Sequence, residues 1–156
     1  LDPSGLPSTL TLNVELRQPV AAWSQDSKDF YVDGDGKSFE YSYHERPTLN
    51  IVDENELSAE YKNTAIASNR FLQTVGRLVT ELDVRRLTVE KLIIPRGMVR
   101  EIDVLVKGSA IRFKLSVDRS PAEQAEDVAR VLRYFNERGE VPQYVDLRVE
   151  QKAFYK

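Results

Sequence analysis

Residues 120–139 read SPAEQAEDVARVLRYFNERG, and this stretch carries the strongest helix signals in the chain. Ser120 is a favourable N-cap, Pro121 suits the first helical position, and Glu123 completes a capping box. Gly139 stands where a helix commonly ends. Between these ends, apolar residues recur at helical spacing, namely Val128, Val131, Leu132 and Phe135. The stretch therefore predicts one amphipathic helix.

The residues before this helix predict a second helix followed by three strands. In residues 65–82, apolar side chains recur every three or four positions, which is typical of a helix packed on a core. The period then changes to two in residues 87–94, 99–106 and 111–115, as expected for strands with one buried face. The middle of the chain thus reads as helix, three strands and helix.

Short strands are expected on both sides of this central part. Before it, the candidates bounded by turn residues are residues 8–16, 20–23, 30–32, 38–41 and 49–52. After it, residues 144–149 and 151–156 alternate as two halves of one strand or as a bent pair. Two helices are too few to cover both faces of a doubly wound sheet. We therefore expect an α+β fold, with a mainly antiparallel sheet and two helices on one face.

The composition excludes several classes of protein. The 156 residues include no Cys, which rules out disulfides, thiolate zinc sites and iron–sulfur clusters. A net charge of −3 argues against general affinity for nucleic acid, although residues 81–156 carry 15 Lys and Arg against 13 Asp and Glu. No apolar run is long enough to cross a membrane, and the first residue is not Met. We expect the chain to be a piece of a longer protein, and a membrane anchor could lie upstream.

The motif Asp33-Gly34-Asp35-Gly36 invites a calcium or phosphate interpretation, and the spacing disfavours both. If Gly36 takes the sixth position of an EF-hand loop, Tyr31 and Ser42 fall where acidic ligands are required. Gly36-Lys37-Ser38 lacks the earlier glycine of a phosphate-binding loop, and a strand rather than a helix follows it. The motif instead predicts the turn of a β-hairpin, so no metal or cofactor is expected.

Other polar groups give weak signals for catalysis. His44 is the single histidine, and no orienting partner follows from its spacing. The carboxylates Glu123, Glu126 and Asp127 fall opposite the apolar face of their helix and indicate a solvated surface. Arginines in the second half either pair with nearby acids or recognise an acidic partner, and these are Arg96, Arg100, Arg112 and Arg119.

The last strand is the most informative surface in the sequence. A terminal strand commonly lies at a sheet edge, where its backbone N–H and C=O groups are unpaired. Such an edge either accepts a strand from a partner or is protected by its own charges, here Glu150, Lys152 and Lys156. The residues leave both alternatives open.

Four segments of the sequence, in order, are similar to the motifs of one known family. Residues 7–23, PSTLTLNVELRQPVAAW, are similar to a P-x-T-L-x-(aliphatic)-x-V-x-E-R-x-P-V-A-x-W junction, with Leu16 inserted between Glu15 and Arg17. Residues 31–36 with Phe39 resemble a V-D-x-x-G-x-x-F hairpin, and residues 46–49 resemble L-P-x-L with Arg46 in place of the first Leu. Tyr144-Val145-Asp146-Leu147-Arg148 resembles the Y-(I/V)-D-L-R that opens a last β-domain strand. The ordered set resembles the extracytoplasmic part of the bacterial cell-division family FtsQ/DivIB.

The resemblance implies a single-pass protein of the cell membrane whose present part lies outside the cytoplasm. Residues 1–17 would be the last strand of a POTRA domain and the junction, and residues 18–156 would be the β domain. The family is not enzymatic and acts as a scaffold in the divisome. It binds the coiled-coil proteins FtsB and FtsL, with no cofactor, metal, nucleic acid or small-molecule substrate.

The resemblance also implies a binding site. In FtsQ the last strand of the β domain accepts an added strand from FtsB, and an Arg on a neighbouring strand helps to hold an acidic partner helix. Carried onto this sequence, the binding strand is residues 149–155, with side-chain contacts from Val149, Gln151 and Phe154. The expected partner-binding residues are Arg100, Arg148, Val149, Glu150, Gln151, Lys152, Ala153, Phe154 and Tyr155.

Two other functions compete with this one. A related POTRA-type module of a secretion or outer-membrane assembly protein would share the architecture, and a barrel domain in the same gene would favour it. An extracytoplasmic hydrolase would need two converging carboxylates, and no spacing in the sequence selects a pair.

Overall fold

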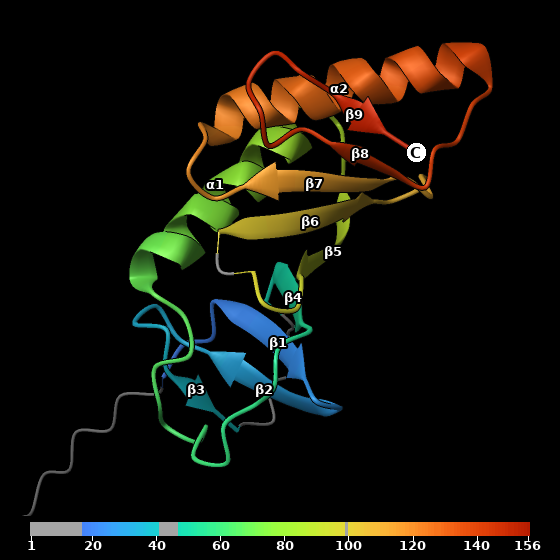
Figure 1. Ribbon diagram of the computed structural model, residues 1–156. Coiled ribbons are helices and arrows are strands. Elements are labelled where there is room, and N and C mark those ends of the chain that lie inside the picture. The colour runs from blue at the N-terminus through green and yellow to red at the C-terminus, as the bar shows by residue number, and fades with distance from the viewer. Residues whose placement is uncertain (1–16, 41–46, 99) are drawn as a thin grey trace, which may run out of the picture.

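Two helices and nine strands make up the fold of the computed structural model, which describes residues 17–40, 47–98 and 100–156 (Figure 1). The helices are α1 (Asn69–Val84) and α2 (Pro121–Arg138). The strands are β1 (Ala21–Gln25), β2 (Lys28–Val32), β3 (Ser38–Phe39), β4 (Leu49–Asp53), β5 (Val89–Ile94), β6 (Glu101–Val106), β7 (Arg112–Ser116), β8 (Tyr144–Asp146) and β9 (Phe154–Tyr155).

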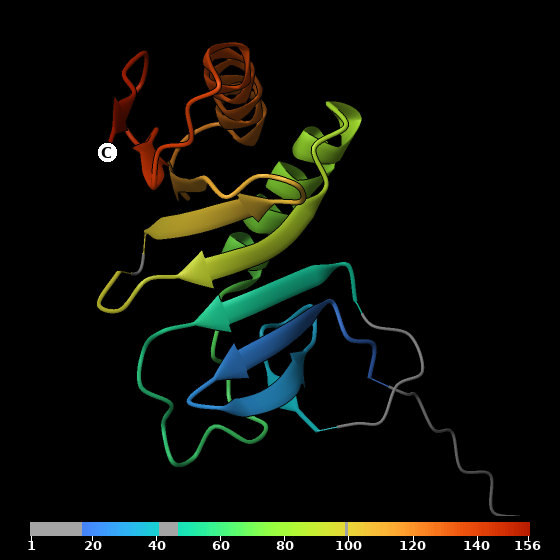
Figure 2. The ribbon, with the colours of Figure 1, turned by 90° about the vertical axis from the view of Figure 1, so that its right-hand side faces the viewer.

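All nine strands belong to one sheet, in the order β3-β2-β1-β4-β5-β6-β7-β8-β9. Neighbours are antiparallel in five of the eight pairs, and the parallel pairs are β1–β4, β4–β5 and β7–β8. Both helices lie on the same side of the sheet (Figure 2). The expected α+β class, with a mainly antiparallel sheet and two helices on one face, is confirmed.

The helix ends follow the local signals. The Ser120 side chain accepts a hydrogen bond from the Glu123 amide, and Gly139 ends α2 in the left-handed conformation at φ 66°. Helix α1 begins four residues later than the apolar spacing predicts, because Ser68 caps it by accepting from the Phe71 amide. Residues 65–67 instead run beside the β2–β3 hairpin.

The core lies between the helices and the sheet. From α1 it takes Leu72, Val75, Leu78 and Leu82, and from α2 it takes Ala125, Val128 and Phe135. The sheet contributes one face of its central strands, with fully buried side chains that include Leu92, Val104, Phe113 and Val145. The period-two pattern in the sequence therefore identified the buried face correctly.

The edge formed by β3 is covered by the chain itself. The Ser38 amide donates to the Thr64 carbonyl at 3.0 Å, and the Asn63 amide donates to the Ser38 carbonyl at 3.1 Å. The buried Ser38 hydroxyl also contacts the carbonyl of Tyr61. Residues 61–66 thus act as a cap on this side of the sheet, and the covered edge offers Ser38 no free backbone group.

Gly36 allows this cap to approach. Its φ is 80°, a conformation that glycine adopts easily, and its carbonyl accepts from the Ile66 amide at 2.9 Å. A Cβ atom at this position would lie 1.8 Å from the Ala67 carbonyl oxygen. The Asp33-Gly34-Asp35-Gly36 turn is the predicted hairpin, since Tyr31 pairs with Phe39 across it.

The proposed division of the chain at residue 17 falls on the limit of the described residues. The strand expected in residues 8–16 lies outside them, as do His44 and Tyr41. Arg17 itself pairs with Asp33 at 3.2 Å, so the start of the described chain contacts the hairpin. Within the described residues, neither helix is both long and apolar enough to cross a membrane.

Candidate partner-binding edge

The C-terminal segment does not form the single strand expected for residues 149–155. Strand β8 ends at Asp146, and only Phe154 and Tyr155 form strand β9, which lies antiparallel to β8. Between them, Gln151 has φ 57° and the Lys152 amide donates to the Val149 carbonyl at 3.2 Å. These features make a turn, so the bent pair is the observed alternative and the continuous strand is wrong.

The register of β9 shows which of its backbone groups face outward. The Lys156 amide donates to the Tyr144 carbonyl at 3.4 Å, and Val145 stands opposite Tyr155. Because bonded and non-bonded pairs alternate in an antiparallel ladder, the N–H and C=O of Tyr155 point away from β8. No other segment of the described chain lies beyond β9 in the sheet, and we call its outer side the open edge.

Exposed aromatic rings flank the open edge on both faces of the sheet. Phe154 is 55% exposed and Tyr155 is 58% exposed. The Tyr155 ring packs edge-on against Phe135 of α2, with centroids 5.1 Å apart, and Phe135 in turn contacts the half-exposed Tyr134. Phe154 stands opposite Asp146 and so faces the other side. Large apolar groups of this kind are typical of contact surfaces.

The turn before β9 lines a groove against α2. This groove has a volume of about 710 Å³, and its apolar floor includes Val131, Leu147 and Ala153. Glu150, Gln151 and Lys152 form one wall, and the charged side of α2 forms the other. Val149 is 49% exposed at the start of the turn. The structure thus brings the predicted residues 149–155 together as a turn, a groove and a short strand.

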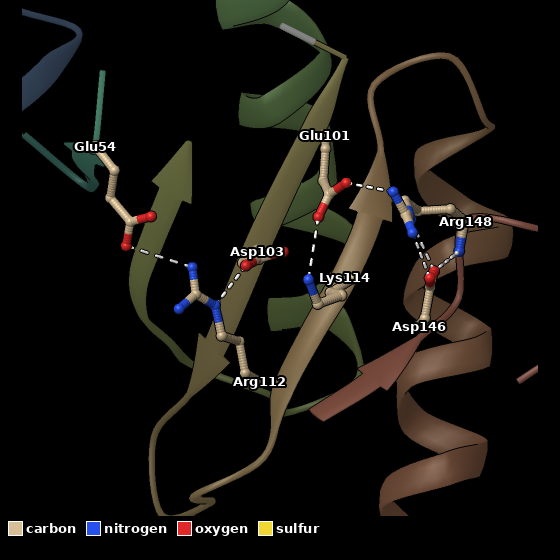
Figure 3. Close-up of polar contacts among 7 residues, drawn as sticks. All are labelled: Glu54, Glu101, Asp103, Arg112, Lys114, Asp146 and Arg148. Carbon is tan, nitrogen blue, oxygen red and sulfur yellow. Dashed lines mark hydrogen bonds and ion pairs between the residues drawn. The ribbon is translucent and has the colours of Figure 1, made fainter. Parts of the chain in front are cut away.

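The face of the sheet away from the helices carries a network of charges, which we call the charged face (Figure 3). Two carboxylates on β6 lie deepest, since the side chains of Glu101 and Asp103 are 6% and 1% exposed. Basic side chains from the neighbouring strands lie over them. The seven residues are Glu54, Glu101, Asp103, Arg112, Lys114, Asp146 and Arg148.

Asp103 is a buried carboxylate that is only partly satisfied by this network. Arg112 contacts one carboxylate oxygen and also reaches Glu54 at 3.5 Å, but the other oxygen, Oδ1, has no hydrogen-bond partner in the described part of the chain. Burial raises the pKa of Asp103, and the neighbouring Arg112 offsets only part of that effect. A buried ion pair of this kind does not by itself indicate that the pair stabilises the fold, because burying the charge costs free energy.

Arg148 is the most completely bonded side chain of the charged face. Its Nε and Nη2 atoms donate to both oxygens of Asp146 at 2.9 and 2.5 Å, and its Nη1 contacts Glu101. The pKa of Asp146 is lowered, chiefly by this hydrogen bond, and the pKa of Arg148 is raised. The sequence placed Arg148 beside the binding strand but gave no sign that Glu101, 47 positions away, would pair with it.

Arg100 lies apart from the rest of the predicted site. It directly precedes β6, its side chain is 73% exposed, and its guanidinium donates to both oxygens of Asp118 at 2.6 and 2.7 Å. Strands β7, β8 and β9 lie between β6 and the open edge. The structure therefore does not bring Arg100 to the open edge, and Arg100 offers a partly free guanidinium only to a partner that extends across the sheet.

The carboxylates of the described ranges do not form a metal site. Asp33 accepts hydrogen bonds from the amides of Asp35 and Lys37, so its carboxylate serves the hairpin turn. Within residues 17–40, 47–98 and 100–156, no three His, Asp or Glu side chains converge in a way that could hold a metal ion.

Neither the family models nor the curated proteins add a relative. No family model matches the chain. No curated protein matches it either. The FtsQ/DivIB resemblance therefore rests on the four motifs quoted from the sequence, and it stays a prediction.

Arg119 helps to hold the chain after β8, a role that its sequence does not distinguish from that of the other arginines. Its Nη1 donates to the Leu147 carbonyl at 2.5 Å, and its Nη2 donates to Asp127 of α2 at 3.1 Å. Arg119 thus ties the segment after β8 to the helix. The pairing of Arg119 with Asp127 can be expected from the sequence only once Ser120 is taken as the N-cap of α2. Arg119 then directly precedes the helix, and Asp127 lies on its second turn.

Proposed function

We propose that this chain is a non-enzymatic scaffold module of bacterial cell division. It binds coiled-coil partners of the FtsB and FtsL type by accepting a partner strand at the open edge of β9. The protein would be anchored in the cell membrane by a single upstream helix, with this part on the extracytoplasmic side. The four ordered motifs support the family, and the α+β fold is compatible with its β domain.

One observation carries the binding mode: of the two edges of the sheet, the β9 edge has no covering segment in the described chain. The outward N–H and C=O of Tyr155 suit pairing with an added strand, which gives affinity through the backbone. The exposed rings of Phe154 and Tyr155 suit side-chain contacts on either face of that strand. The groove beside α2 gives room for an apolar side chain that flanks it.

The charge of the surface supports the nature of the partner. The side chains of Arg112 and Lys114 are 34% and 28% exposed, while the carboxylates that they pair with, Asp103 and Glu101, are buried beneath them. The charged face therefore presents more positive charge to a partner than a count of its acidic and basic residues suggests. An acidic helix that follows the added strand would meet this layer, and such complementarity favours selection and orientation of a partner.

The test is calorimetric titration of this domain with extracytoplasmic peptides of the FtsB-type and FtsL-type proteins from the same organism. Two variants separate the backbone from the ring. Tyr155→Ala removes the ring and keeps the N–H, whereas Tyr155→Pro removes both. Proline is tolerated at an edge position whose N–H faces outward, and circular dichroism checks that the fold is kept.

We expect Tyr155→Pro to bind several-fold more weakly than Tyr155→Ala, because one hydrogen bond contributes roughly 0.5–1.5 kcal/mol. Equal affinities of the two variants would show that the Tyr155 N–H does not pair with the partner. No binding of the unmodified domain at high micromolar peptide would contradict the proposed partners.

A further inference from the structure

The segment that joins β8 to β9 is held from both faces of the sheet. On the charged face, Arg148 bonds both oxygens of Asp146 and contacts Glu101. Glu101 belongs to β6, so this contact passes across β7 (Figure 3). Arg148 therefore links the chain just after β8 to a strand in the centre of the sheet.

On the helix face, a second arginine holds the preceding residue. The carbonyl of Leu147 accepts from Arg119 at 2.5 Å, and Arg119 also binds Asp127 of α2. The Leu147 amide donates to the Lys114 carbonyl on β7 at 2.9 Å, and the Leu147 side chain is buried. Leu147 and Arg148 are thus fixed in position relative to β6, β7 and α2.

Strand β9 has little of its own to fix it. It is two residues long, both residues are exposed, and the turn before it passes through a left-handed residue, Gln151. Strands this short are not stable without support from their surroundings. Its support comes from β8 on one side, from the packing of the Tyr155 ring on Phe135 and, through the turn, from the fixed pair of Leu147 and Arg148.

We infer that Arg148 is a positioning residue for the open edge, rather than a contact for the partner. Its guanidinium is already bonded by two carboxylates, and one of them, Glu101, is buried and available to no other molecule. Arg148 holds the end of β8 so that the turn returns β9 in register. This inference rests on the proposed function, since it assigns a role within the proposed binding site, but it also has a test that needs no partner.

Glu101→Gln separates the two roles by the sign of its effect. If Arg148 positions the edge, loss of the Glu101 charge loosens Arg148 and weakens binding of the FtsB-type peptide about three- to tenfold. If Arg148 instead contacts an acidic partner, the same substitution frees its charge and binding tightens. Tighter binding by Glu101→Gln would overturn the inference.

Arg148→Lys and Arg148→Gln provide the matched pair. Lys keeps the charge and loses the fork that bonds Asp146 and Glu101 together. A positioning role predicts that both variants weaken binding to a similar extent, with an unchanged dependence on salt. A direct contact predicts that Lys retains most of the binding, and that Gln alone flattens the salt dependence. That second pattern would count against positioning.

The measurement without a partner is amide hydrogen exchange by NMR on the domain alone. We expect Arg148→Gln and Glu101→Gln each to speed exchange of the Lys156 amide, which donates to the Tyr144 carbonyl, by about tenfold or more. Amides in the middle of α1 should be unchanged, which shows that the fold persists. Unchanged exchange at Lys156 in both variants would overturn the inference, and this result is independent of whether any peptide binds.

Discussion

The two edge strands of the sheet have the same length, but the chain covers the outer side of one and leaves the outer side of the other uncovered. Strands β3 and β9 each have two residues, and they lie at opposite ends of the sheet (Figure 1). At β3, Ser38 is bonded on its outer side by Thr64 and Asn63. At β9, no described segment covers Tyr155, and the edge is fixed from behind by the charges around Arg148. The β3 edge is covered by backbone hydrogen bonds, whereas the β9 edge is uncovered in the described chain.

The difference teaches where strand addition can occur in this molecule. An unprotected edge is a liability, and proteins usually cover it, shorten it or charge it. This chain covers one edge with residues 61–66 and keeps the other short, flanked by aromatic rings and by Lys156. Among the described residues, the outer side of β9 is therefore where a partner strand can pair, and changes at the two edges should have different consequences.

The largest expected effect is at the covered edge. Gly36→Ala would place a Cβ atom 1.8 Å from the Ala67 carbonyl oxygen and would force a left-handed φ on alanine. The loop must move away from the cap, so we expect a loss of about 3 kcal/mol or more in the free energy of unfolding. Denaturation by urea, followed by circular dichroism, measures it.

Gly34→Ala is the matched control in the same turn. A Cβ atom at Gly34 has nothing within 4 Å, and the Gly34 φ is not positive. We expect this variant to stay within about 0.5 kcal/mol of the unmodified chain. Similar losses in both variants would mean that the turn, rather than the approach of the cap, accounts for the effect.

A smaller effect is expected from Ser38→Ala, which removes a hydroxyl from the covered edge. The Ser38 side chain is fully buried and contacts the Tyr61 carbonyl, so its loss leaves that acceptor with one fewer partner. We expect a loss of about 1–2 kcal/mol in the free energy of unfolding, with faster hydrogen exchange at Asn63 and no change at Lys156. Ser24→Ala, at an exposed hydroxyl, serves as the control and should change stability little.

How far the sequence predicts these features depends on whether the signal is local. The cap at Ser120, the left-handed Gly139 and the hairpin at Asp33 were predictable because a few adjacent residues determine each of them. The turn at Gln151 was not, since glutamine carries no preference for a positive φ that would break an alternating pattern.

The candidate site shows the same division. Tyr155 could be placed at a sheet edge because it lies in the last strand of the chain. The bond between Arg148 and Glu101 could not be predicted, because it depends on β6 and β8 standing one strand apart in a sheet whose order no local pattern reveals. The cover on β3 could not be predicted for the same reason, since the backbone bonds of Asn63 and Thr64 to Ser38 leave no mark in the sequence.

The charges behind the open edge predict a response to acid. The pKa of Asp146 is lowered by its hydrogen bond to Arg148, so the folded state favours the ionised carboxylate. This stabilisation is present above the unfolded pKa of about 3.9 and is lost as the pH falls through the lower, folded pKa. We expect Asp146→Asn to cost about 1 kcal/mol at pH 7, and its difference from the unmodified chain to shrink below about pH 4.

Urea denaturation from pH 2.5 to 7 measures this difference, and hydrogen exchange at Lys156 shows whether the open edge loosens along with it. A gap between Asp146→Asn and the unmodified chain that is constant over this range would mean that Arg148 does not stabilise the ionised form of Asp146.

The smallest effect, with the opposite sign, is expected at Asp103. Burial raises the folded pKa of this carboxyl, so its contribution is greatest below the unfolded pKa of about 3.9 and is lost as the pH rises through the folded pKa. Asp103→Asn removes a charge whose Oδ1 is unpartnered, and Arg112 keeps Glu54 as a neighbour. We therefore expect the variant to lie within about 1 kcal/mol of the unmodified chain at pH 7. Relative to the variant, the unmodified chain should lose stability between pH 4 and 7. A relative gain over that range would mean that the pairing with Arg112 outweighs the burial, and that the charged face stabilises the sheet as well as holding its open edge.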